Sequence, residues 1–127
     1  MRMRHPVFIL AFFKLALLAT VHQLAVLDYW YWRYPWLDTA VHFTAGLTIG
    51  LFITWFLLVY MTKQVTPAMS LGIVLAGSLV VGVLWEIFEM EIGAPRDANF
   101  IFDTKMDLIA DIFGALVANL LARKFFI

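Results

Sequence analysis

The sequence predicts an all-α integral membrane protein, a bundle of four transmembrane helices, from its composition and its long runs without charged residues. Hydrophobic residues make up 64% of the 127 positions and charged residues only 14%. Soluble domains average about 45–50% apolar and about 25% charged residues. A chain of this length cannot hide so much apolar surface in a water-soluble core. We therefore expect residues 1–127 to form one transmembrane domain.

The same composition excludes several classes of function. Nine Lys and Arg balance nine Asp and Glu, so the formal net charge is zero and gives no basic surface for nucleic acid. The chain has no cysteine. Disulfides, thiolate metal sites, iron–sulfur clusters and a cysteine nucleophile are therefore excluded.

The first three spans follow from charge-free runs of sufficient length. A spanning helix needs about 20 mostly apolar residues. Residues 39–62 and residues 64–85 contain no Asp, Glu, Lys or Arg, and residues 7–27 are interrupted only by Lys14. The pattern predicts spans near residues 7–27, 38–61 and 67–92.

The fourth span is predicted near residues 104–122 and requires acidic residues within the membrane. The charge-free run at 112–122 is too short to cross a bilayer alone. The helix must begin near Asp103 or Met106, which places Asp107 and Asp111 inside the membrane.

Turn residues and aromatic residues mark the expected helix boundaries. Pro6 opens the first helix, and Pro67 suits the first position of the third helix. The aromatic stretch at residues 28–36 is typical of the headgroup level. Residues 93–95 end the third helix. We expect Asp38 to cap the second helix, and Asp103 or Thr104 to cap the fourth.

The distribution of Lys and Arg predicts the orientation. One side would hold Arg2, Arg4, Lys63, Arg123 and Lys124, and the other Arg33, Arg96 and Lys105. Because cytoplasmic segments carry the excess of positive residues, both termini are expected in the cytoplasm.

In this arrangement all nine acidic residues fall in the non-cytoplasmic half of the protein. Most lie in loops or at helix ends, where charge costs little, but Glu86, Asp107 and Asp111 lie deeper. A charged residue near the centre of a membrane helix costs about 2.5–3.5 kcal/mol. These acids must be protonated, paired with a base, or neutralised by a metal ion.

Helical spacing places the polar residues on three stripes that each continue into glycine. The stripes are Asp103, Asp107, Asp111 and Gly114; Gly82, Glu86 and Glu89; and Asp38, His42, Gly46 and Gly50. Glycine allows close packing of helices in lipid, so the stripes are expected to face the bundle interior. The polar side chains would then converge at one level.

An oxygen-rich set with one imidazole suits a divalent metal ion such as Mg, Mn, Fe or Zn. We expect Glu86, Glu89, Asp103, Asp107 and Asp111 to supply metal ligands, and His42 and Asp38 to act in catalysis. The metal would polarise a phosphoryl or carbonyl oxygen and activate water, with His42 or a free carboxylate as the base. His22 is a weaker candidate ligand.

Three patches of the sequence resemble a known family. They are Asp38-Thr-Ala-Val-His-Phe-Thr-Ala-Gly46, Trp85-Glu-Ile-Phe-Glu89 and Asp103-Thr-Lys-Met-Asp-Leu-Ile-Ala-Asp-Ile-Phe-Gly-Ala115. Together they resemble the signature of YjdF-like proteins and, more distantly, VanZ-like proteins. The resemblance implies a bacterial inner-membrane protein of packed helices with a polar cluster, and no defined activity.

Three functions remain open at this stage. The first is a metal-dependent hydrolase or transferase acting on a lipid-linked or phosphorylated substrate at the outer interface. The second is a non-catalytic protein that binds or conducts ions. The third is a structural subunit of a homo-oligomer or larger membrane complex. The cytoplasmic halves of the last three helices read as almost purely apolar, which favours a blind pocket over a path through the membrane.

Overall fold

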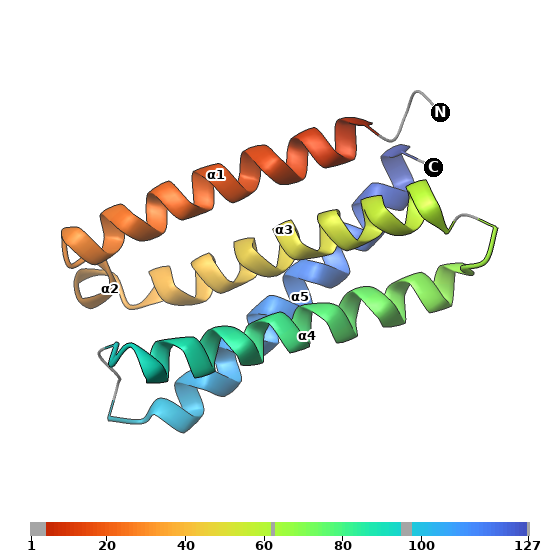
Figure 1. Ribbon diagram of the computed structural model, residues 1–127. Helices are drawn as coiled ribbons and strands as arrows, with labels where there is room; N and C mark the ends of the chain where they lie inside the picture. The colour runs from red at the N-terminus through yellow and green to blue at the C-terminus, as the bar shows by residue number, and fades with distance from the viewer. Residues whose placement is uncertain (1–4, 62, 95–97, 127) are drawn as a thin grey trace.

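The computed structural model describes residues 5–61, 63–94 and 98–126, and every regular element within these ranges is an α-helix (Figure 1). The helices are α1 (His5–Leu27), α2 (Trp30–Arg33), α3 (Trp36–Tyr60), α4 (Pro67–Glu91) and α5 (Phe100–Phe126). The prediction of an all-α fold is confirmed for the described residues. Helices α1, α3 and α4 are each long and apolar enough to cross a membrane. Three of the four expected spans are therefore present as candidate membrane helices.

Helix α3 lies at the centre of the bundle. It packs against α1, α4 and α5, and α5 crosses behind α3 and α4 (Figure 1). The short helix α2 and the α4–α5 connection lie at one end of the bundle, which we term the α2 end. The α3–α4 turn and the last residues of α5 lie at the opposite end.

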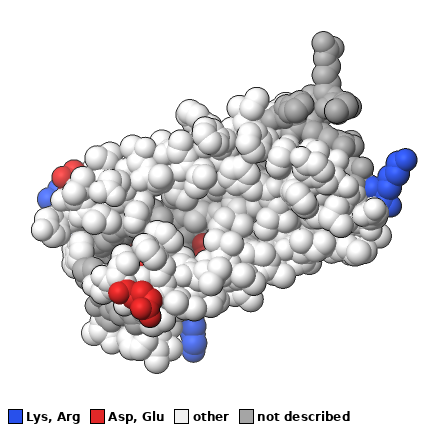
Figure 2. Space-filling model, in the orientation of Figure 1, with Lys and Arg blue, Asp and Glu red and all other residues white. Residues whose placement is uncertain are grey.

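On the face drawn in Figure 2, charged side chains gather toward the two ends of the molecule, and the surface between them is almost entirely uncharged. Large apolar side chains are exposed along this middle band, including Phe13 at 65% on α1 and Leu84 at 58% on α4. A continuous apolar surface of this kind is expected of a protein whose sides face lipid. Arg2, Arg4 and Arg96, used for the predicted orientation, lie outside the described residues.

Several predicted helix boundaries are confirmed. The side chain of Thr66 caps α4 by accepting a hydrogen bond from the Met69 amide, and Pro67 occupies the first turn. Gly93 follows α4 with a φ of 67°, a left-handed conformation that glycine adopts without strain. Pro95 lies outside the described residues.

The predicted N-caps of the second and fourth long helices are wrong. Helix α3 begins at Trp36 after Pro35, so Asp38 already lies in its first turn. Helix α5 begins at Phe100, and the Asp103 amide donates to the Asn99 carbonyl at 3.1 Å. Both helices therefore begin upstream of the carboxylates, where the helix dipole still favours negative charge.

Glycine brings α3 and α5 into backbone contact, as the stripes predict. A Cβ atom added to Gly46 would overlap the backbone carbonyl of Asp111, and one added to Gly114 would overlap that of Phe43. At Gly50 an added Cβ would lie 2.8 Å from the Ala118 Cβ, closer than real side chains approach. This contact fixes the polar residues of α3 against those of α5.

Candidate functional site

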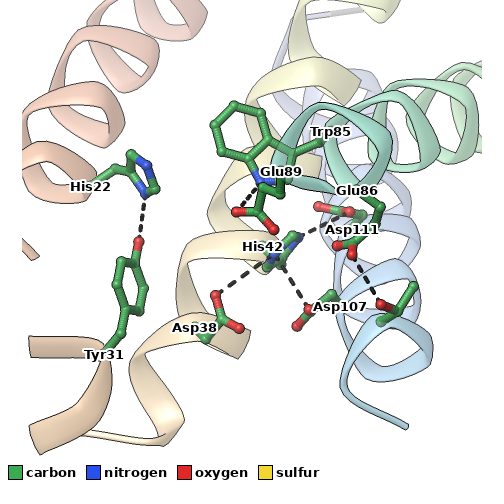
Figure 3. A network of polar contacts seen from close by, with 10 residues as sticks. His22, Tyr31, Asp38, His42, Trp85, Glu86, Glu89, Asp107 and Asp111 are labelled. Carbon is green, nitrogen blue, oxygen red and sulfur yellow. Dashed lines mark hydrogen bonds and ion pairs between the residues drawn. The ribbon is translucent and has the colours of Figure 1, made fainter. Parts of the chain in front are cut away.

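His42 is the centre of the polar cluster and is buried between α3 and α5 (Figure 3). Its Nδ1 lies 3.2 Å from Asp111 Oδ2. Its Nε2 lies 3.7 Å from Asp107 Oδ2 and 3.8 Å from Asp38 Oδ1. The two nitrogens of the ring therefore face different carboxylates. Nδ1 faces the buried Asp111, and Nε2 faces Asp38 on α3 and Asp107 on α5.

Asp111 is held where three helices meet. Its backbone carbonyl contacts Gly46 on α3 and accepts a hydrogen bond of 3.1 Å from the Ser78 hydroxyl on α4. A Cβ atom added to Gly82 would lie 2.7 Å from Asp111 Oδ2. The backbone of Asp111 is therefore fixed against α3 and α4, and its carboxylate lies between Gly82 and His42 Nδ1, where it orients the His42 ring.

Asp38, His42 and Asp107 form a group whose geometry could hold a metal ion, which we term the metal triad. Each residue offers one ligand atom, and these atoms all lie within 4.8 Å of one another. Tetrahedral zinc with bonds of about 2.0–2.2 Å separates its ligand atoms by roughly 3.3–3.6 Å. The observed separations of 3.7 and 3.8 Å from His42 Nε2 need only a small contraction to reach that range.

The metal triad has one buried and one accessible side. Asp107 is 4% exposed, and its Oδ1 has no hydrogen-bond partner among the described residues. The Asp38 side chain, in contrast, is 36% exposed. A ligand could therefore approach from the α2 end, past Asp38.

Glu86 and Glu89 on α4 flank the triad but have partners of their own (Figure 3). Glu86 Oε2 accepts a hydrogen bond of 3.0 Å from the Thr104 hydroxyl, whereas its Oε1 is buried and without a partner among the described residues. Glu89 Oε1 accepts a bond of 3.0 Å from the Trp85 indole. Asp103 is half-buried one turn before Asp107. Of the predicted site residues, the structure brings Asp38, His42, Asp107 and Asp111 into direct contact and places Glu86, Glu89 and Asp103 around them.

The cluster carries more negative charge than its protein partners can balance. Within the described ranges, every ion pair of these carboxylates is made with His42. The described cations at the α2 end, Arg33 and Lys105, form no ion pair with it. An additional positive charge, from a proton or a metal ion, is needed to keep several buried carboxylates together.

His22 lies outside the triad and is paired with a residue that the sequence did not single out. Its Nδ1 lies 2.7 Å from the hydroxyl of Tyr31 on α2, and its ring packs edge-on against Trp85 with centroids 5.5 Å apart. Burial raises the pKa of Tyr31, so its phenol stays protonated and can donate to His22. Tyr31 belongs to the aromatic stretch, and nothing in its spacing distinguishes it from the neighbouring interface residues.

A second buried polar group contradicts the expectation that the far halves of these helices are almost purely apolar. The Asn119 amide on α5 donates to the hydroxyls of Thr54 on α3, at 3.2 Å, and Ser70 on α4, at 3.0 Å. All three residues are at most 3% exposed. Each is an isolated polar residue in an apolar run, but Asn119 lies eight positions after Asp111. Extending the Asp103–Asp107–Asp111 stripe would have found it.

Comparison with known proteins gives the family but no activity. No curated protein and no solved structure matches the chain. One family model matches residues 1–126, nearly the whole length of the sequence. This match shows that the chain belongs to the family described as predicted membrane protein (DUF2238), in agreement with its long apolar helices.

Proposed function

We propose that this protein binds a divalent metal ion at Asp38, His42 and Asp107, within a four-span bundle, and uses it for hydrolysis or group transfer. The observation that carries this proposal is the division of roles on His42. A histidine that binds a metal through one ring nitrogen almost always donates its other N–H to a carboxylate, carbonyl or water. With Nδ1 held by Asp111, Nε2 is left to face Asp38 and Asp107.

The fourth span is the helix α5. Its 27 residues extend about 40 Å, more than the roughly 30 Å of the hydrocarbon core. Its outer face is apolar, with Ile109, Phe113 and Leu120 each more than half exposed, whereas Asp107 and Asp111 are buried. The acids lower the average hydropathy of α5 without contacting lipid. Both termini would then lie in the cytoplasm, with the metal triad in the outer half of the bilayer.

The arrangement around the triad suits metal-assisted attack by water. A bound ion would polarise a phosphoryl or carbonyl oxygen of a substrate that enters past the exposed Asp38 side chain. With His42 as a ligand, the free Oε1 of Glu86 becomes the candidate base for the attacking water. A lipid-linked or phosphorylated substrate fits a site at this depth.

Metal titration of the purified protein tests the proposal. Protein stripped with EDTA should bind one Zn²⁺, Mn²⁺ or Mg²⁺ per chain and recover thermal stability, because binding favours only the folded state. Asp107→Asn should abolish binding. Asp28→Asn, which removes an exposed acid in the α1–α2 turn, is the matched control and should bind normally. Metal-free protein whose melting ignores both EDTA and added ion would refute the proposal.

A second candidate function, ion handling without catalysis, is favoured by the buried Asn119 group. Asn119 and Thr54 lie on the two helices that carry the triad, and Ser70 lies on α4, so polar residues recur along the α3–α4–α5 interface. Flux of protons or metal ions into vesicles that contain the protein would support this candidate. Metal-dependent turnover of a phosphorylated lipid without flux would favour the enzyme.

The proposal also includes a relation to a more specific family and a location in the cell. The three patches at residues 38–46, 85–89 and 103–115 support a relation to YjdF-like and distantly VanZ-like proteins of the bacterial inner membrane. Assembly into a homo-oligomer or a larger complex remains compatible with the exposed apolar surface.

A further inference from the structure

A second histidine, His22 on α1, lies at the α2 end of the bundle with Tyr31 as its partner. Its Nδ1 is 2.7 Å from the Tyr31 hydroxyl, and both side chains are half-buried. Because the phenol keeps its proton and donates it to Nδ1, the neutral imidazole carries its own proton on Nε2. The pair therefore presents an N–H donor of fixed tautomer.

The face of α3 that carries Asp38 is directed between α1 and α4. On α3, Leu51 belongs to the core cluster that includes Ala11 of α1, and Ile53 lies against Gly77 of α4. At 3.6 residues per turn, Asp38 is about 140° from Leu51 and about 60° from Ile53, on the arc that joins these two directions. The 36% exposure of the Asp38 side chain agrees with this position.

His22 and Tyr31 lie on this same side of the polar cluster (Figure 3). The His22 ring packs edge-on against Trp85 of α4 with centroids 5.5 Å apart, and the Trp85 indole donates to Glu89. Burial raises the pKa of Tyr31, and the negative charges of Asp38 and Glu89 raise it further, as expected of a phenol near both carboxylates. A ligand that reaches the metal triad past Asp38 therefore passes beside the His22–Tyr31 pair.

Nε2 of His22 is a hydrogen-bond donor without a partner among the described residues. The neighbouring Trp85 indole is taken by Glu89, and the Tyr31 hydroxyl is taken by His22 itself. A phosphorylated substrate would bring negatively charged oxygens into a site rich in carboxylates. The metal ion can bind one of these oxygens, and a preorganised N–H donor stabilises a second one as negative charge develops during attack by water.

We infer that His22, oriented by Tyr31, donates a hydrogen bond from Nε2 to a phosphoryl oxygen of a substrate bound at the metal triad. This inference rests on the proposed function and narrows its substrate class to phosphate esters. His22 is then a catalytic residue, and Tyr31 is a positioning residue. A purely structural pair would instead join α1 to α2 and leave the binding of phosphate unchanged.

Inorganic phosphate is the probe that tests this inference, titrated by calorimetry into purified protein loaded with Zn²⁺. His22→Phe keeps an aromatic ring beside Trp85 but removes the donor. It should weaken phosphate binding about 10–100-fold, the range expected for a hydrogen bond to a charged group. His22→Gln keeps an N–H donor near the position of Nε2 and should retain most of the affinity. Equal phosphate affinities in the wild type and His22→Phe refute the inference, as does a metal-loaded wild type that binds no phosphate.

Tyr31→Phe and Tyr34→Phe form a matched pair of variants. Tyr34 belongs to the same aromatic stretch, but it is exposed and its ring packs against Trp36. Tyr31→Phe should weaken phosphate binding and let the proton of the His22 ring exchange between its two nitrogens, which ¹⁵N NMR detects. Tyr34→Phe should change neither property, and the spectrum of His22→Phe identifies the His22 signals. An unchanged tautomer in Tyr31→Phe, or an equal loss of phosphate affinity in both tyrosine variants, overturns the role of Tyr31.

Metal titration of the same samples separates failure of this inference from failure of the proposed function. Normal metal binding with equal phosphate affinities in all variants overturns only the role of His22. Wild-type protein that binds no metal overturns the proposed function. Loss of metal binding in His22→Phe makes His22 a ligand and overturns the inference. Circular dichroism shows whether each variant folds, and Tyr31→Phe carries the test should His22→Phe fail to fold.

Discussion

Replacing Gly46 by alanine should separate α3 from α5 at the site itself. The new Cβ would overlap the backbone carbonyl of Asp111, which is rigid helix backbone rather than the end of a flexible side chain. The two helices must therefore move apart. That movement lengthens the 3.2 Å contact between His42 and Asp111 and the 3.1 Å bond from Ser78 to the Asp111 carbonyl.

The cost follows from three terms. Overpacking costs about 1–3 kcal/mol. Two weakened interhelical hydrogen bonds add roughly 0.6 kcal/mol each in a membrane protein. Alanine in place of glycine stabilises a helix by about 0.5–1 kcal/mol, which offsets part of this cost. The free energy of unfolding should therefore fall by about 1–4 kcal/mol in Gly46→Ala.

Gly72→Ala provides the matched control for this measurement. Gly72 also lies within a helix, but an added Cβ would meet nothing within 4 Å. Its variant should be as stable as the wild type or more stable by up to about 1 kcal/mol. Both variants can be unfolded with SDS in mixed micelles and followed by circular dichroism. If Gly46→Ala proves as stable as Gly72→Ala, the close contact described here is wrong.

Three further predictions address the site, the second polar group and the topology. Asp111→Asn should weaken metal binding about 10–100-fold in titration, because a group that orients a histidine ligand supports the metal affinity of the site. Asp28→Asn should leave metal binding unchanged. Equal metal affinities in the two variants would show that Asp111 does not orient His42. Asn119→Ala should lower the free energy of unfolding by about 1 kcal/mol, because two interhelical hydrogen bonds are lost. An unchanged unfolding curve would show that these hydrogen bonds do not stabilise the bundle. Reporters fused after Gln64 and after the C-terminus should both give cytoplasmic signals, whereas a periplasmic signal from either would overturn the orientation.

The sequence by itself determined the class of protein and the position of most helices. Long charge-free runs specify where a chain can cross a bilayer, because lipid offers no partner to a backbone or a charge. Pro67 and Gly93 mark helix ends through their backbone preferences alone, independently of any neighbour. The glycine stripes also predicted which faces pack, and Gly46 confirms it by its contact with Asp111.

Average hydropathy along the sequence does not separate the two faces of α5. Asp107 and Asp111 are buried against the other helices, whereas the apolar side chains of Ile109 and Phe113 are exposed on its outer face. Only the folded bundle separates the two faces of this helix.

The tertiary structure decided which polar groups meet. Helical spacing placed Asp107 and Asp111 on one stripe, yet His42 faces them with different nitrogens, so Asp111 orients the ring while Asp107 joins the metal triad. Tyr31 pairs with His22 on another helix, and Asn119 donates hydrogen bonds to Thr54 and Ser70 on two other helices. Periodicity fixes the face of a helix, but the pairing of atoms depends on the angle, rotation and depth at which separate helices cross.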